Sequence, residues 1–269
     1  MQVRNGFAEL IKISSVGKLD LWKGSCNVFE LHLYVTPKCT DLVKYGPQLV
    51  KTRFGRLNDD QELIQAADSI CERAIKLMLE LESPNLHEIR LNRVIAFGHT
   101  YVPSIEARSM IDFENSWSPT LELTPVIPLR HGHAITIDMA YGTTLAWKRG
   151  YITEEERDEF HQLAYDVGLS LDHEAFDAKL LDVATTAILK TRDGKQWFAE
   201  PRPLGTCFFI NDASMEELKA ALVEHKSLIK TKYAKHANGV GHDAFVDKSD
   251  LGMDPEERML LSSFVQHPS

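Results

Sequence analysis

The sequence of 269 residues lacks the features that identify nucleic-acid-binding, membrane and secreted proteins. It has no run of lysine and arginine and carries a formal net charge of -9, so nucleic acid is not an expected partner. Its apolar runs are too short to span a bilayer, and its first residues do not resemble a signal peptide. These absences predict a cytoplasmic protein with no membrane partner.

Cysteine is scarce, and the motifs of several enzyme classes are missing. The four cysteines, Cys26, Cys39, Cys71 and Cys207, include no Cys-x-x-Cys pair, which favours a reduced chain. The sequence contains no H-E-x-x-H, no G-x-S-x-G and no P-loop. It also has no G-x-G-x-x-G opening a strand–helix unit, so no cofactor-binding residue for a dinucleotide is predicted in this chain.

What is present is mostly helical pattern. Residues 58–82 are the clearest case, with Asn58 as the expected cap, Gln61 completing a capping box, and apolar residues at helical spacing. Thr153 with Glu156 and Ser214 with Glu217 predict two more helix starts, and Gly168 predicts an end. Residues 131–149 predict a buried helix, 174–190 another helix, and 205–211 a short strand or buried connector.

The expected organisation is one helical domain over residues 1–231 and a loose tail over 232–269. Two segments interrupt the pattern. Residues 24–40 alternate like a strand, and residues 101–116 separate Gly98-His99-Thr100 from Trp117-Ser118-Pro119. Both are candidate inserts, either introns translated in frame or genuine surface loops, which cost little free energy.

Three residues of the kind that bind metals lie in short distinctive contexts. Glu9 lies in Phe7-Ala8-Glu9-Leu10-Ile11-Lys12, His99 in Phe97-Gly98-His99-Thr100, and His131 in Leu129-Arg130-His131-Gly132-His133. One carboxylate and two imidazoles suit a zinc site whose fourth position stays open. An open position allows Lewis-acid chemistry rather than a purely structural role.

Taken singly, each residue also has an ordinary structural explanation. Glu9 and Lys12 share a helix face at i, i+3 and can form a surface ion pair. His99 can be a hydrogen-bonded core histidine, and His131 can cap the buried helix. His133, two residues from His131, points elsewhere on a helix and is a candidate for contact with the ligands or with substrate.

The three contexts together resemble the sugar phosphate cyclases of the dehydroquinate synthase-like superfamily. In that family a glutamate in G-x-A-E-x-I-K, the histidine of F-G-H-T and the histidine of L-x-H-G bind the catalytic metal. The resemblance implies these roles for Glu9, His99 and His131. It implies catalytic or substrate contacts for a second set of residues: Lys12, Arg93, His133, Lys190, Arg192 and Lys195.

Details of the motifs narrow the subfamily. Ala96 stands where dehydroquinate synthases have asparagine, and no histidine follows His99 by four residues. Residues 128–140 and 201–212 are most similar to the sedoheptulose 7-phosphate cyclases that form demethyl-4-deoxygadusol for mycosporine biosynthesis. The alternatives are a 2-epi-5-epi-valiolone synthase, a 3-dehydroquinate synthase-like lyase, or a non-catalytic fragment or pseudoenzyme.

The resemblance implies a carbon–oxygen lyase that eliminates phosphate from a sugar phosphate and closes a carbocycle by an aldol step. Its cofactors would be Zn²⁺, or another divalent metal, and NAD, and its assembly a homodimer. The family has an N-terminal α/β domain for NAD and a helical C-terminal domain for metal. The sequence matches only the second, so we expect a helical metal-binding domain without the NAD domain, inactive in isolation.

Overall fold

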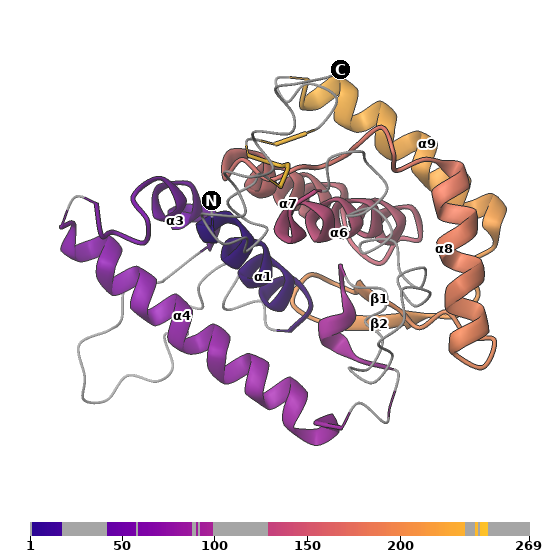
Figure 1. Ribbon diagram of the computed structural model, residues 1–269, viewed down its shortest axis with the longest axis horizontal. Helices are drawn as coiled ribbons and strands as arrows, with labels where there is room; N and C mark the ends of the chain where they lie inside the picture. The colour runs from indigo at the N-terminus through magenta and orange to yellow at the C-terminus, as the bar shows by residue number, and fades with distance from the viewer. Residues whose placement is uncertain are drawn as a thin grey trace, which may run out of the picture.

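The computed structural model describes residues 2–17, 42–57, 59–87, 90, 92–98, 129–234, 240–241 and 243–246. These residues form a helical protein with one short two-stranded sheet, which confirms the predicted mostly α fold (Figure 1). None of the helices in these ranges is both long enough and apolar enough to cross a bilayer. The candidate inserts at 24–40 and 101–116 lie outside the described residues.

The described residues form α-helices, two 3₁₀ turns and a pair of strands between α8 and α9. The α-helices are α1 (Gln2–Gly17), α3 (Leu42–Lys51), α4 (Gln61–Glu82), α6 (His131–Lys148), α7 (Glu154–Asp166), α8 (Ala178–Thr191) and α9 (Met215–Lys232). Two 3₁₀ turns, η1 (Ser83–Asn85) and η2 (Val94–Ala96), follow α4. Strands β1 (Phe198–Pro201) and β2 (Cys207–Ile210) pair antiparallel, so of the two alternatives for 205–211 the short strand is the one present.

Two helix starts test the capping residues that were predicted from the sequence. Thr153 and Glu156 form the predicted reciprocal capping box of α7, and Gly168, with φ of 79°, lies just past its end. At α9, Ser214 accepts from the Glu217 amide as predicted, but the Glu217 side chain binds Arg149 instead of completing a box.

The predicted cap of α4 is wrong by two residues. Asp60, not Asn58, is the N-cap, and its carboxylate accepts from the amides of Glu62 and Leu63. Both residue types are good caps, so the choice depends on which of them aligns the apolar face with the core. Most of the predicted apolar face is confirmed. Its buried members are Leu63, Ala67, Ile70, Ala74 and Leu77, and the last predicted member, Leu81, is partly buried.

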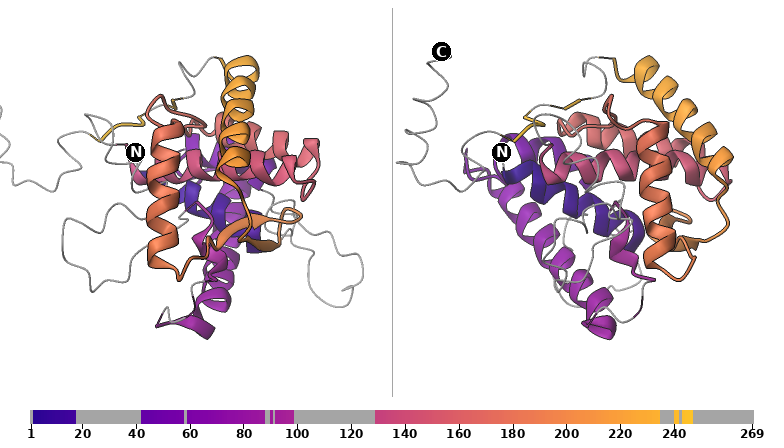
Figure 2. Two further views of the ribbon diagram at one scale, coloured as in Figure 1. Left: turned by 90° about the vertical axis from the view of Figure 1, so that its right-hand side faces the viewer. Right: turned by 45° about the vertical axis from the view of Figure 1, so that its right-hand side comes forward.

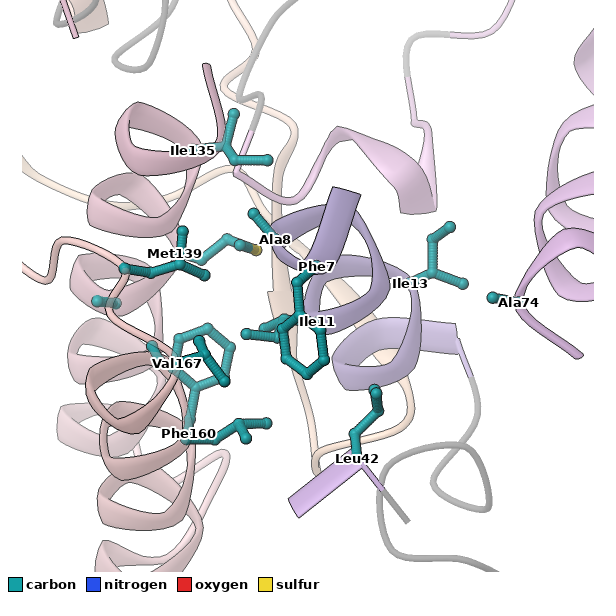
Figure 3. Close-up of a cluster of buried hydrophobic side chains, with 14 of the residues drawn as sticks. Phe7, Ala8, Ile11, Ile13, Leu42, Ala74, Ile135, Met139, Phe160 and Val167 are labelled. Atoms are coloured by element: carbon teal, nitrogen blue, oxygen red, sulfur yellow. The ribbon is translucent and has the colours of Figure 1, made fainter. Parts of the chain in front are cut away.

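Helix α6 is the centre of the molecule, and every residue from Gly132 to Ala146 is buried. One of its faces packs on α1 and α7, where Phe7 and Ile11 meet Met139 and Phe160 (Figure 3). Fully burying each such large apolar side chain contributes about 1.5–3 kcal/mol. The predicted buried helix at 131–149 is therefore confirmed.

The other face of α6 forms a second core with α8, α9 and the hairpin. Ile137, Tyr141 and Leu145 pack there against Leu181 and Leu218. Figures 1 and 2 show α8 and α9 together at the edge of the molecule, with α6 and α7 between them and α1. A helix covered on both sides has no amphipathic pattern, because it has no solvent face.

Two buried histidines, His161 on α7 and His225 on α9, lie close to each other. His161 Nε2 donates to Ala140 O at 2.9 Å, His225 Nε2 donates to Leu171 O at 2.9 Å, and the ring centroids are 5.7 Å apart. Both side chains are fully buried. Burial disfavours the charged rings and lowers the pKa of His161 to about 3 and that of His225 to about 4.

This pair predicts loss of stability in mild acid. Each folded-state pKa lies below the unfolded value near 6.5, so the stabilisation is present above that pH and is lost as the pH falls toward 4. Between pH 7 and pH 5 the free energy of unfolding should drop by about 2 kcal/mol per histidine. Chemical denaturation at the two pH values measures it.

Two variants test the role of the ring. His225→Gln has an amide that can replace the ring's bonds to Leu171 and Thr144, and it should lose less stability on acidification. His87→Gln, at an exposed position, is the control and should behave as the wild type. The measured quantity is the difference between the proteins, because buried acids such as Glu200, whose pKa is raised, change the total stability in the opposite sense. An equal loss of stability on acidification in the wild type and in His225→Gln would contradict the expectation.

A candidate metal centre between α1 and α6

The structure brings Glu9 and His131 together although 122 residues separate them in the chain. Glu9 lies in the middle of α1, and His131 is the first residue of α6. His131 Nε2 is 3.2 Å from Glu9 Oε1, and the two side chains are 44% and 35% exposed. The pair is thus within reach of solvent and of a ligand.

Lys12 binds the other oxygen of the same carboxylate. Its Nζ lies 2.5 Å from Glu9 Oε2, and its side chain is only 6% exposed. The i, i+3 pair predicted from spacing is present, but it is not a surface pair. A buried ammonium is costly unless it is paired, so Lys12 fixes the Glu9 side chain while Glu9 keeps the Lys12 charge in the interior.

Close approach of the two helices depends on Gly132. An ideal Cβ there would lie 2.6 Å from Asn5 Cα and 2.7 Å from Asn5 Oδ1. Asn5 Oδ1 accepts from the Gly132 amide at 3.1 Å, and the N-cap residue Arg130 makes no side-chain capping bond. Helix α1 therefore supplies the cap of α6. The positive N-terminal end of α6 also favours the Glu9 carboxylate beside it.

Glu9 and His131 suit a shared divalent cation. A carboxylate oxygen and an imidazole nitrogen are zinc donors, and two donors about 2.1 Å from one tetrahedral ion are roughly 3.4 Å apart. The Oε1–Nε2 distance of 3.2 Å is close to that value. Among the described residues no third His, Cys, Asp or Glu joins the pair.

The third predicted ligand, His99, lies outside the described residues. The residue before it, Gly98, has φ of 71° and packs on α6. An ideal Cβ on Gly98 would lie 2.6 Å from Met139 Cγ and 3.0 Å from Ile135 O. Ile135 lies one helical turn after His131 on α6. The residue that precedes His99 in the chain therefore packs on the helix that carries His131.

Two further predicted residues lie in buried or half-buried surroundings. His133 is buried, and its Nδ1 accepts from the Ser170 amide at 3.2 Å and lies 2.9 Å from Ser170 Oγ. Arg93 precedes η2, and one of its guanidinium nitrogens lies 3.3 Å from Glu82 Oε1. His133 thus points to a different side of α6 from His131, as the helical spacing predicted.

The three basic residues expected to contact substrate, Lys190, Arg192 and Lys195, lie in the last turn of α8 and in the loop that follows it. Figures 1 and 2 place α8 at the edge of the molecule, whereas α1 is central. Arg192 has contacts within its own loop, and its expected contact with phosphate stays a prediction. Its buried guanidinium donates to Gln196 O at 2.7 Å and to Trp197 O at 3.3 Å, so it closes its own loop. Lys195 lies over the Trp197 ring, and Lys190 lies in the last turn of α8.

Sequence reasoning missed the residues that hold the pair in place. Asn5 lies one turn before Glu9 on α1, and that i, i+4 spacing was the signal available for it. Arg4 also binds the far end of α7, with Nε donating to Val167 O at 3.0 Å. No local pattern indicated that Arg4 would bind Val167 or that Arg130 would bind Ala244, because these partners are distant in sequence.

A family profile for the 3-dehydroquinate synthase C-terminal region matches residues 39–195. The chain belongs to the 3-dehydroquinate synthase C-terminal family. It is 45% identical to demethyl-4-deoxygadusol synthase of Trichormus variabilis over 239 residues, which is 89% of this chain and 50% of that protein. It is 26% identical to 3-dehydroquinate synthase of Alkaliphilus metalliredigens over 170 residues, 61% of this chain and 44% of that protein.

A solved family member has the same fold. The chain matches 2-epi-5-epi-valiolone synthase from Streptomyces hygroscopicus, solved with NAD⁺ and Zn²⁺ bound, with a TM-score of 0.65 and 31% identity. The match covers 84% of this chain and 51% of that one. The chain spans about half the length of the curated relatives it matches. The expected resemblance to the cyclase family is therefore confirmed.

The contact between α1 and α6 predicts opposite effects for two glycine substitutions. Gly132→Ala should destabilise this family member by about 1–3 kcal/mol, since the new methyl group would overlap the α1 backbone. Gly6→Ala is the matched control on α1, where nothing lies within 4 Å of an added Cβ. It should stabilise by about 0.5–1 kcal/mol through helix propensity. Denaturant unfolding measures both, and equal effects would contradict the close contact.

Proposed function

We propose that Glu9, His99 and His131 together hold a Zn²⁺ ion, and that the chain provides the metal and substrate half of a sedoheptulose 7-phosphate cyclase of the demethyl-4-deoxygadusol type. The convergence of the Glu9 carboxylate and the His131 ring is the observation that carries the proposal. The 45% identity to a demethyl-4-deoxygadusol synthase, against 26% to a 3-dehydroquinate synthase, supports the choice within the family.

The neighbouring residues fit the chemistry that this reaction needs. Bound zinc would act as a Lewis acid that lowers the pKa of a substrate hydroxyl. Lys12, held beside Glu9, would stabilise negative charge as it develops on substrate oxygen. Arg93 would contact phosphate, as the resemblance implies, through a fork-shaped guanidinium suited to its oxygens.

The support for the cofactor comes from a solved relative, and the assembly is proposed from the family resemblance alone. The related valiolone synthase was solved with NAD⁺, and we propose the same cofactor for the complete reaction. We assign no residue of the described ranges to it. A homodimer, a sugar phosphate as substrate and a cytoplasmic location belong to the same proposal.

A 3-dehydroquinate synthase is the second candidate because the matching family profile carries that name. Ala96 argues against it, since it stands where those enzymes are expected to have asparagine. Ala96 ends η2 and is buried, so it offers no polar group at that point.

Zinc binding is the first test. The wild-type chain should bind Zn²⁺ in a calorimetric titration, and Glu9→Gln and His131→Ala should each weaken binding by at least about 10-fold, since each removes a donor. Exposed His87→Ala is the control and should leave the affinity unchanged. Equal affinities for wild type and His131→Ala would contradict the metal site.

A chimera tests the reaction. This chain would replace the matching half of the Trichormus variabilis enzyme, with NAD⁺, Zn²⁺ and sedoheptulose 7-phosphate supplied. We expect phosphate release from the chimera and none from the 269-residue chain alone or from a His131→Ala chimera. The substrate of 3-dehydroquinate synthase should not react. A folded chimera that binds both cofactors yet releases no phosphate would contradict the cyclase proposal. Phosphate release by the 269-residue chain alone would show that the reaction does not need the other half of the Trichormus variabilis enzyme.

A further inference from the structure

Residues 240–241 and 243–246, here called the C-terminal strap, lie against both helices that carry the proposed ligands. The sequence predicts a loose tail from residue 232, and α9 does end at Lys232. The strap nevertheless makes specific bonds. Leu129 and Phe245 form an antiparallel bridge, and the Arg130 amide donates to Ala244 O at 2.8 Å.

Asp243 is the centre of the strap. Its Oδ2 lies 3.1 Å from Arg4 Nη1, and its backbone oxygen accepts from Arg130 Nη1. The residue has φ of 58°, a left-handed conformation that aspartate tolerates better than most residues. Such conformations are retained where surrounding contacts fix them, and here those contacts come from two different helices.

The strap is also anchored beside His133. The Gly241 amide donates to Ser170 Oγ at 2.8 Å, and Ser170 binds His133 Nδ1. An ideal Cβ on Gly241 would overlap the backbone of residues 168–170, so only glycine allows this approach. The strap therefore has a fixed path on both sides of Asp243.

Asp243 is joined to the two ligand-bearing helices at the points that matter for Glu9 and His131. Arg4 precedes Glu9 by five residues on α1, and Arg130 immediately precedes His131. We propose that the C-terminal strap, through Asp243, sets the separation of Glu9 and His131 and so acts as a positioning element for the metal. The proposal rests on the proposed metal site.

The size of the expected effect distinguishes positioning from general stability. The Arg4–Asp243 pair is partly exposed, with side chains 23% and 41% accessible, so it should add little to the free energy of unfolding. Metal affinity is more sensitive to ligand geometry. Loss of a group bonded directly to a ligand typically weakens it 10–100-fold, and Asp243 acts one contact further out, through Arg4 and Arg130, so an effect at the lower end of that range is expected. The strap should therefore affect zinc binding more than folding.

Two substitutions separate positioning from simple electrostatics. Asp243→Asn keeps the shape and tolerates the left-handed conformation, and it should weaken Zn²⁺ binding about 10-fold. That loss alone could reflect the missing negative charge. Arg4→Gln removes a positive charge, so electrostatics predicts tighter zinc binding, whereas loss of the strap contact predicts weaker binding.

The matched control lies at the opposite end of α6. Arg149 follows the last residue of that helix and lies 2.7 Å from Asp212, another exposed aspartate. Asp212→Asn breaks the same kind of pair away from the Glu9–His131 pair and should leave zinc affinity within about twofold, as expected for an exposed ion pair. Chemical denaturation of all variants checks that each is folded.

A metal-free measurement keeps the two proposals distinguishable. Without zinc, hydrogen exchange at the amides of Arg130 and His133 should be faster in Asp243→Asn than in the wild type, and unchanged in Asp212→Asn. Unchanged exchange in Asp243→Asn, or tighter zinc binding by Arg4→Gln, would overturn the strap proposal. A wild-type chain that binds no zinc refutes the proposed metal site, and the exchange result then decides whether the strap holds the helices.

Discussion

The close contact between α1 and α6 at Gly132 is the constraint on which the remaining structure depends. Only a glycine lets the Asn5 backbone come so near, and that approach lets Asn5 cap α6. The same approach places the Glu9 carboxylate at the N-terminal end of α6, where the helix dipole favours it. Packing, capping and electrostatics therefore all act at one junction, and the candidate metal centre is a consequence of it.

A helix buried on every side has to satisfy its polar groups internally, and α6 shows how this is done. Thr136, Thr143 and Thr144 return hydroxyl bonds to carbonyls one turn earlier. Glu200 lies fully buried against Gly142, and burial together with the nearby Asp138 carboxylate raises its pKa well above the usual range. The pKa shifts of Glu200, His161 and His225 therefore all favour the neutral form, as expected for ionisable groups buried around α6.

Sequence patterns predicted what depends on neighbours along the chain. The capping box at Thr153 and the apolar face of α4 follow from short-range spacing, and both are present. The α4 cap was displaced because Asn58 and Asp60 have similar capping propensity, so packing decided between them. The contacts of Arg192 could not be predicted in this way, because only the structure shows that its buried guanidinium donates to the backbone of its own loop.

The sequence alone determined which residues can bind a metal, because a carboxylate and imidazoles are recognisable without coordinates and their flanking motifs identify the family. It also determined that the chain is helical, because periodicity is a local property. Only the tertiary structure decided that Glu9 Oε1 and His131 Nε2 meet at 3.2 Å, and that Asp243 binds Arg4 and Arg130. Those contacts join residues more than a hundred positions apart, and their geometry follows from how helices pack, which no local pattern records.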